Sequence, residues 1–283
     1  TSMRIPRNSL IKVYNESASR AANQIIARYS SSFALATRLL SEPTRTDIRN
    51  LYAVVRIADE IVDGTALLAG GNPPALLDEY EQQVRSASRE RFHTDPILQA
   101  FSNTARRCEL EDEHLEAFFT SMRSDLDIKQ HDDASLKDYI YGSAEVIGLL
   151  CLDIFLTDHP TSASEKQRLQ AGAKSLGAAF QKINFLRDQN EDTETLGREY
   201  FPPDSERSKI IKEIEMDLKL AKEVIPSLPL TARAGVLAAT GIFEELTSRL
   251  AQSGPTRERI RVSGAKKLAI SIQAAGTALR RKQ

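Results

Sequence analysis

The chain has 283 residues, of which 41% are hydrophobic and 27% charged, so it can bury a large core. Its 38 Lys and Arg balance 39 Asp and Glu to a net charge of −1, which excludes the basic character of a general nucleic-acid binder. The low content of Gly and Pro favours helices, and we therefore expect an all-α protein with no nucleic-acid partner.

Apolar and small residues recur at helical spacing through residues 9–40, with an interruption at 29–32 that predicts two helices. The serines there offer hydroxyls for an N-cap, or equally an anion site at a helix start. Pro43 and Thr44 open the next helix, which Gly64 and the loop 70–74 bring to an end. This helix carries Asp59 and Asp63, the first of two acidic pairs described below.

The same periodicity predicts eight further helices, at residues 76–88, 96–109, 114–127, 136–155, 162–186, 209–227, 230–253 and 263–281. The helix 136–155 is markedly apolar and contains Gly142 and Gly148, which admit close approach of a neighbour, so we expect it at the centre. Between 192 and 205 the sequence is irregular, and Pro202 and Pro203 forbid a helix. This predicts a loop beside residue 192.

No targeting or membrane-spanning segment is recognisable. Charged residues are spread through the first 30 positions, and no run of about 18 consecutive apolar residues occurs. Cys108 and Cys151 are too few for a disulfide scaffold and lack zinc-site spacing. We expect a cytoplasmic protein without a transmembrane segment, forming one domain over residues 1–283, in which Thr1 and Ser2 are residues left by cloning.

Two acidic pairs stand out because each lies in an otherwise apolar helical run. Asp59 and Asp63 are four residues apart, and so are Asp188 and Asp192. Residues four apart lie about 40° apart around a helix and about 6 Å along it, so each pair shares a face and its charges repel. A cation resolves that repulsion, and Mg²⁺ typically bridges carboxylates to substrate phosphates.

An acidic pair on a solvated helix face is ordinary in a chain with 39 acidic residues, and that interpretation stands beside the functional one. Two pairs of the same design, each with an arginine close by, are more informative. Arg56 lies three residues before Asp59, and Arg187 directly precedes Asp188. An arginine there neutralises carboxylates or clamps phosphate oxygens bidentately. Metal-assisted chemistry on a phosphorylated substrate is the hypothesis that the two pairs favour.

Five segments together resemble the motifs of a known family, the squalene and phytoene synthases, which are head-to-head isoprenoid diphosphate synthases. The segments are SSFALATRLL at 31–40, LYAVVRIADEIVDG at 51–64, YIYGSAEVIG at 139–148, QKINFLRDQNED at 181–192 and GREYFP at 197–202. The fourth and fifth together are the most specific. The resemblance covers about residues 22–268, and the chain is most similar to a bacterial phytoene synthase.

The resemblance implies an isoprenoid-synthase fold, a single helical domain around a central cavity, with two or three Mg²⁺ ions, or Mn²⁺ in their place. The implied metal ligands are Asp59, Asp63, Asn184, Asp188 and Asp192. The implied substrate-binding residues are Ser32, Phe33, Tyr52, Arg56, Gln181, Asn184, Arg187, Arg259 and Lys267. The implied catalytic residues are the four aspartates with Tyr141 and Tyr200, and the implied tunnel lining is Phe33, Leu149, Leu176 and Phe180.

One position departs from the family pattern. A tyrosine often found in the helix before the C-terminal arginine, here Arg259, is replaced by Ile242 or Phe243. One phosphate contact that the family pattern implies therefore lacks its usual residue.

The resemblance implies that two allylic diphosphates condense through a cyclopropylcarbinyl diphosphate, with geranylgeranyl diphosphate giving phytoene as the first choice. The alternative is a squalene, dehydrosqualene or presqualene diphosphate synthase that uses farnesyl diphosphate, with NADPH needed only for squalene. A noncatalytic assembly factor of the same fold is a third interpretation, disfavoured because all four aspartates are present. Peripheral membrane contact for product release is a further expectation.

Overall fold

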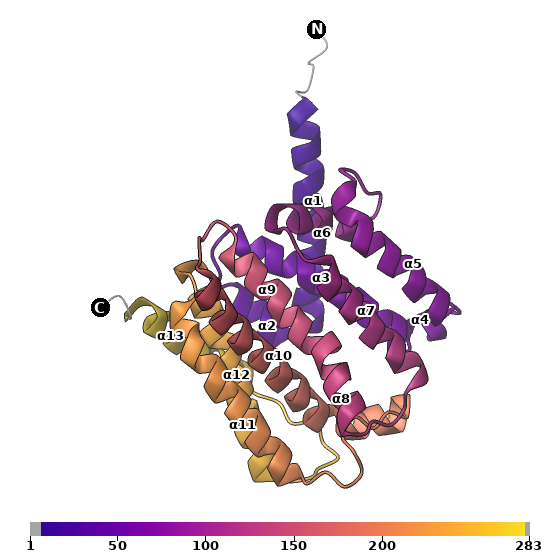
Figure 1. The fold of residues 1–283 in the computed structure, drawn as a ribbon, viewed down its shortest axis with the longest axis vertical. Coiled ribbons are helices and arrows are strands. Elements are labelled where there is room, and N and C mark those ends of the chain that lie inside the picture. Colours follow the sequence, from indigo (N-terminus) through magenta and orange to yellow (C-terminus); the bar gives the residue numbers. More distant parts are fainter. Residues whose placement is uncertain (1–6, 281–283) are drawn as a thin grey trace.

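Helices form almost all of residues 7–280, the part of the chain that the computed structural model describes (Figure 1). The all-α prediction is confirmed for these residues, where the extended pairing is an isolated bridge between Gln130 and Glu199. The helices are α1 Arg7–Tyr29, α2 Ser31–Thr37, α3 Thr44–Val62, α4 Thr65–Leu68, α5 Pro73–Ser86, α6 Pro96–Cys108, α7 Asp112–Asp127, α8 Asp133–Ile140, α9 Val146–Leu156, α10 Ala163–Glu191, α11 Arg207–Val224, α12 Leu230–Ser253 and α13 Gly264–Arg280. Thr1, Ser2 and Arg281 lie outside the described residues.

Side-chain caps explain several helix starts. The Ser30 side chain accepts a hydrogen bond from the Phe33 backbone N–H at 3.1 Å, so Ser30 is the N-cap of α2. Asn72 caps α5 ahead of Pro73, and this helix begins three residues before its predicted start. Asp132 and Ser135 form a capping box, which starts α8 three residues before the predicted helix start at 136.

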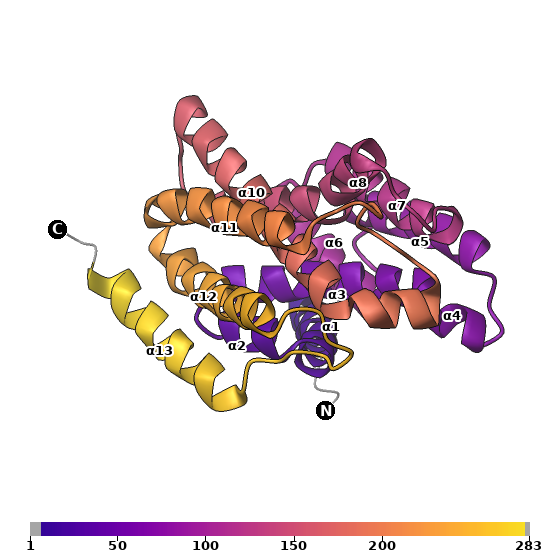
Figure 2. The same cartoon turned by 90° about the horizontal axis from the view of Figure 1, so that it is seen from below.

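The core has two main parts, and α10 contributes to the second of them. Around α3, α6 and α7 the fully buried rings of Phe101, Phe118 and Phe119 form the first part. Ile183 of α10, Ile214 of α11 and neighbouring apolar side chains form the second. The long helix α10 packs against α9 on one side and α11 on the other, and α13 lies at the edge of the molecule against α12 (Figure 2). The second acidic pair is thereby carried on a central helix.

The predicted helix 136–155 is interrupted. A π-helical turn, Tyr141–Glu145, separates α8 from α9. Gly142 within it lies so close to α7 that a Cβ atom there would be 1.9 Å from the Ser121 Oγ atom. A π turn inserts one extra residue into a helix, which shifts the direction of the side chains that follow. The prediction of one regular helix was wrong at this point.

The continuous segment Asp133–Leu156 is long and apolar enough to cross a membrane by length and composition alone. Half of its most apolar window is buried inside the fold, as is usual for a central helix of a bundle, so this is weak evidence for a membrane span. Gly148 of α9 lies against the Ala173 carbonyl of α10, and Gly177 of α10 lies against the Ala144 carbonyl. These reciprocal contacts agree with the expected central position of the segment.

Candidate active site

The ends of α3 and α10 bring the two acidic pairs together. Asp59 lies in the last turn of α3 and Asp63 is its C-cap, while Asp188 lies in the last turn of α10 and Asp192 begins a π-helical turn, Asp192–Leu196. Burial raises the pKa of Asp192 to about 7, with further contributions from the charges of Asp188 and Asp63. Asp63 is 129 positions away in sequence, so the four carboxylates form one electrostatic cluster.

Asp59 is the most perturbed member of the cluster. Burial, and then the nearby charge of Asp63, raises its pKa to about 8. Its side chain nevertheless keeps 31% of its surface accessible to water, which is the situation of a carboxylate enclosed on most sides but open to solvent. A cation that reaches Asp59 would therefore stabilise the ionised form of its carboxylate.

Arginines contact the carboxylates from several elements. Arg187 donates from Nε and Nη2 to the two oxygens of Asp188 at 2.8 and 2.7 Å, a bidentate pair. The Nε atom of Arg259 lies 3.3 Å from the same carboxylate, so the weakly patterned C-terminal segment does reach α10. Arg56 lies 3.7 Å from Asp59 and donates from Nε to Glu60 at 2.9 Å. The predicted arginines therefore surround both acidic pairs.

A second group of predicted residues joins the start of α2 to α13. The Lys267 Nζ atom donates to the Ser31 Oγ atom at 2.7 Å, next to the predicted Ser32. Burial lowers the pKa of Lys267, and the charges of Arg187 and Arg261 lower it further, which places these cations together. Burial raises the pKa of Tyr52 to about 12, and its ring centroid lies 6.3 Å from that of Phe33. Lys267, Arg187 and Arg261 therefore form a cationic face. It adjoins the carboxylate cluster, because Arg187 also contacts Asp188.

Two functional candidates, Arg198 and Asp125, were missed in the sequence. Arg198, only 4% exposed, donates from Nη1 to Asp63 at 2.7 Å. Asp125, 3% exposed, accepts hydrogen bonds from the Tyr139 hydroxyl at 2.6 Å and the Tyr200 hydroxyl at 3.0 Å. Burial raises the pKa of Asp125 to about 6, against the opposing effects of Arg198 and the hydroxyls. For Arg198 the sequence did offer a signal, the GREYFP motif. Its two charged residues are Arg198 and Glu199.

The two tyrosines predicted as catalytic have different surroundings. Tyr200 is buried, and its ring stacks on Phe185 with centroids 4.0 Å apart. Tyr141 is 39% exposed, has Lys174 over its ring, and lines a surface pocket with Glu113. The structure therefore does not bring Tyr141 to the acidic pairs.

Gln181 and Asn184 lie on the same helix as the second acidic pair. The Gln181 side chain donates to Ser143 of the π turn at 3.0 Å, which joins α10 to that turn. Asn184 is half-buried and lies four residues before Asp188, so both share a face of α10. Of the two, Asn184 has the placement expected of a ligand group.

Aromatic rings fill the interior next to the acidic pairs. Phe180 packs on Phe243 with centroids 4.2 Å apart, and Phe33 lies 5.4 Å from Phe243. Leu176 packs against the same cluster, whereas Leu149 is buried on α9. Phe243 occupies one of the two positions where the family pattern has a tyrosine, and it presents a ring without a hydroxyl. The interior here is apolar and aromatic.

The donor set was tested for its fit to a metal ion. Within residues 7–280, no three side chains of the types His, Cys, Asp and Glu are arranged to hold a metal. The chemistry of the set nonetheless fits Mg²⁺ or Mn²⁺, because it consists of carboxylate and amide oxygens, the ligands that such hard cations prefer. Burial first, and then neighbouring carboxylates, raise the pKa of Asp59 and of Asp192, and a bound cation would favour their ionised forms.

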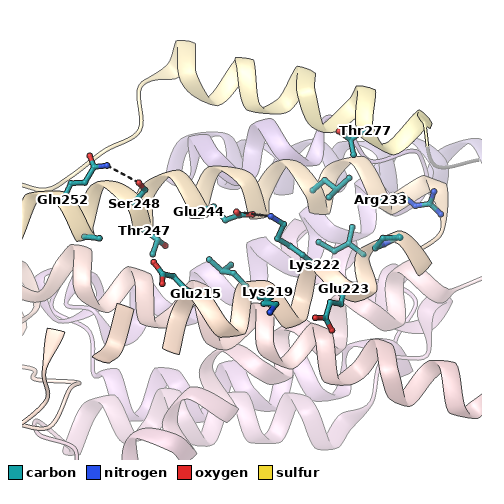
Figure 3. A pocket seen from close by; sticks show the side chains of 15 residues that line it. Glu215, Lys219, Lys222, Glu223, Arg233, Glu244, Thr247, Ser248, Gln252 and Thr277 are labelled. Carbon is teal, nitrogen blue, oxygen red and sulfur yellow. Dashed lines mark hydrogen bonds and ion pairs between the residues drawn. The ribbon is translucent and has the colours of Figure 1, made fainter. Parts of the chain in front are cut away.

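A groove of about 940 Å³ lies elsewhere, between α11 and α12 (Figure 3). An ion pair between Lys222 and Glu244, at 3.1 Å, crosses it, and Lys219 and Glu223 lie on its α11 side. None of the four aspartates lines it. The groove is therefore separate from the candidate active site.

Raising the pH from 5 to 8 is expected to lower the thermal stability of the chelator-treated wild type more than that of Asp59→Asn. A carboxyl with a raised pKa keeps its proton in the folded state after the unfolded chain has lost it, so stability falls between about pH 4 and about pH 8. Asparagine removes this titration. Melting temperatures measured in EDTA across this range test it, and parallel curves for the two proteins would contradict it.

Comparisons with known proteins place these features in context. The model of the family described as squalene/phytoene synthase matches residues 26–208. Phytoene synthase 1 of Zea mays is 30% identical over 203 residues, which cover 71% of this chain and 47% of that protein. The chain thus spans about half the length of this relative.

A bacterial relative and a solved structure match over nearly their whole lengths. The 15-cis-phytoene synthase of Enterobacter agglomerans is 26% identical over 288 residues, covering 88% of this chain and 92% of that protein. A crystal structure of a dehydrosqualene synthase in complex with a ligand superposes with a TM-score of 0.78 at 21% identity, covering 93% of this chain and 97% of the other. The fold is therefore shared with that synthase, as the resemblance in sequence implied.

Proposed function

The chain belongs to the squalene/phytoene synthase family, and from this premise we propose that it condenses two allylic isoprenoid diphosphates head to head with release of diphosphate. The observation that carries the proposal is the meeting of the two acidic pairs at the ends of α3 and α10, with arginines on both. We infer geranylgeranyl diphosphate as substrate and phytoene as product. The match to a bacterial phytoene synthase over 92% of its length supports this choice.

The second candidate is condensation of farnesyl diphosphate to squalene, dehydrosqualene or presqualene diphosphate. The shared fold with a dehydrosqualene synthase is compatible with it, and NADPH is required only if the product is squalene. A noncatalytic assembly factor is disfavoured because Asp59, Asp63, Asp188 and Asp192 are all present and lie together.

We propose that the site takes two or three Mg²⁺ ions, or Mn²⁺ in their place, held by Asp59, Asp63, Asn184, Asp188 and Asp192. When bound, these ions supply positive charge that stabilises the departing diphosphate. The chain's own cations complete this role. Arg56, Arg187 and Arg259 are partly exposed and sit on carboxylates that a metal ion would neutralise. Their guanidinium groups can then donate bidentately to diphosphate oxygens.

The aromatic interior handles the other end of the substrate. Loss of diphosphate leaves an allylic cation, and the double bond of the second substrate attacks it. Loss of a proton from the resulting cation then closes the ring and gives a cyclopropylcarbinyl diphosphate. Phe33, Phe180 and Tyr52 present ring faces, which attract a cation, and their apolar surface keeps water away from it. Lys267 and Arg187 are close enough for their charges to interact, and together they can bind the departing diphosphate.

For release of the hydrocarbon we propose peripheral contact with a membrane through α13. Leu268, Ile272 and Leu279 are exposed, and positions 4 and 11 apart return to one side of a helix. Lys266 and Arg280 lie on the same helix and suit anionic headgroups.

The product assay tests the proposed function. Purified protein with Mg²⁺ is incubated with geranylgeranyl or farnesyl diphosphate, with and without NADPH, and the extracted hydrocarbon is identified. We expect phytoene from geranylgeranyl diphosphate without NADPH, and faster turnover when anionic vesicles are added. A C30 product from farnesyl diphosphate alone would establish the second candidate. Absence of diphosphate release from both substrates would refute the enzyme assignment.

A further inference from the structure

Behind the acidic pairs lies a buried polar cluster formed by Arg198, Asp125, Tyr139 and Tyr200. All four residues are less than one-tenth exposed. They come from α7, α8 and the loop after α10, which are distant in sequence. Because Arg198 is 4% exposed, it is placed differently from Arg56, Arg187 and Arg259, whose side chains are 20–43% exposed. Arg198 is therefore enclosed by protein on the side away from the carboxylate cluster.

Arg198 connects the two acidic pairs directly. Its side chain donates to the Asp63 carboxylate at 2.7 Å and to the Val62 carbonyl at 2.6 Å, so it holds the C-terminal end of α3. Its backbone N–H donates to the Asp192 carbonyl at 3.0 Å. One residue thus contacts the last member of each acidic pair, and its position determines the spacing between them.

Asp125 in turn anchors Arg198. The Asp125 carboxylate lies 4.0 Å from the Arg198 Nε atom and is itself oriented by the hydroxyls of Tyr139 and Tyr200. The loop is fixed from the other side, because the Glu199 backbone N–H donates to the Lys129 carbonyl at 2.7 Å. Among the residues that the structure describes, the Arg198 Nε atom has no hydrogen-bond partner, so Asp125 attracts the guanidinium from behind by charge alone, while Asp63 and Val62 accept its hydrogen bonds in front.

We propose that Arg198 is a positioning residue that sets the separation of the two acidic pairs for metal and diphosphate, with Asp125 as its anchor. The inference rests on the proposed function for the identity of the ligands. Groups that orient metal ligands from behind typically affect metal affinity by about 10–100-fold when they are removed. Lysine keeps the charge of Arg198 but lacks the planar fork that reaches Asp63 and Val62 together.

Arg198→Lys is expected to raise the Mg²⁺ concentration for half-maximal thermal stabilisation, measured with saturating inorganic diphosphate, by about tenfold. The matched control is Arg107→Lys, which cuts another arginine–aspartate pair, with Asp47, in the first turn of the same helix α3. The control should lower the melting temperature without changing the Mg²⁺ requirement. Equal Mg²⁺ shifts in the two variants would overturn the proposal.

A milder variant keeps the test decisive if Arg198→Lys does not fold. Tyr200→Phe removes one hydroxyl from Asp125 and leaves the ring that stacks on Phe185. We expect it to shift the Mg²⁺ requirement in the same direction by a smaller factor, and an unchanged requirement would count against the anchor. The measurement needs no turnover. An inactive wild type that still binds Mg²⁺ and diphosphate would therefore refute the proposed function alone.

Discussion

Replacing Asp59 or Asp188 by asparagine is expected to slow diphosphate release at least about a thousandfold, since about 4 kcal/mol of transition-state stabilisation would be lost. Each residue belongs to one acidic pair, so each variant removes the charge of a proposed metal ligand. Arg56 keeps Glu60 as its partner in Asp59→Asn, whereas Asp188→Asn removes the carboxylate that Arg187 binds bidentately. Asparagine keeps the shape of the side chain. Steady-state release of diphosphate with Mg²⁺ and either substrate measures the loss.

Asp78→Asn is the matched control for this experiment. Asp78 is an exposed aspartate of α5 that pairs with Arg123 at 2.8 Å, away from the carboxylate cluster. A surface pair of this kind contributes at most about 1 kcal/mol to stability, and its loss should leave turnover unchanged. Circular dichroism and melting temperatures establish that all three variants fold. If Asp59→Asn or Asp188→Asn turns over within a fewfold of the wild-type rate, the acidic pairs are not required for the reaction.

Replacing both Gly148 and Gly177 by alanine is expected to destabilise the protein by about 2–6 kcal/mol, because forced overpacking costs about 1–3 kcal/mol per site. A Cβ atom at Gly148 would lie 2.5 Å from the Ala173 carbonyl oxygen, and one at Gly177 would lie 2.5 Å from that of Ala144. Both neighbours are backbone, so the helices themselves must move apart. Calorimetry should show a drop in melting temperature of roughly 5–20 °C.

Gly276→Ala provides the comparison for the glycine pair. Gly276 lies in α13, and a Cβ atom there would meet nothing within 4 Å. Alanine is the better helix former by about 1 kcal/mol, so this variant should be as stable as wild type or more stable. If the double variant at Gly148 and Gly177 has the same melting temperature as Gly276→Ala, the close contact of α9 and α10 is not needed for stability.

Helical periodicity predicted the long helices well because their apolar faces are buried on one side. It could not predict the π turn at Tyr141–Glu145, because its cause is the approach of Gly142 to Ser121 on another helix. Tyr141, which was implied by the resemblance, is exposed, and it is the buried Tyr139 that contacts Asp125.

The same limit explains which site residues were found. Asp59 and Asp188 were recognisable because each is followed, four residues later, by a second aspartate in an otherwise apolar run. Asp125 and Arg198 were not, since a single charged residue in an amphipathic helix or a loop reads as solvated. Arg259 and Lys267 came only from the resemblance to a family, and their contacts with Asp188 and Ser31 depend on the path of the chain after α12.

The hydrogen bond from Lys267 to Ser31 joins residues 236 positions apart. Contacts of such long range form late, because the loop they close carries a large entropic cost. During synthesis at about 5–20 residues per second, the start of α2 leaves the ribosome tens of seconds before α13 is made. The acidic pairs can therefore meet before the last cations arrive. Completion of the cationic face at Lys267 should be the final event of folding, and fragments ending before Arg259 should lack it.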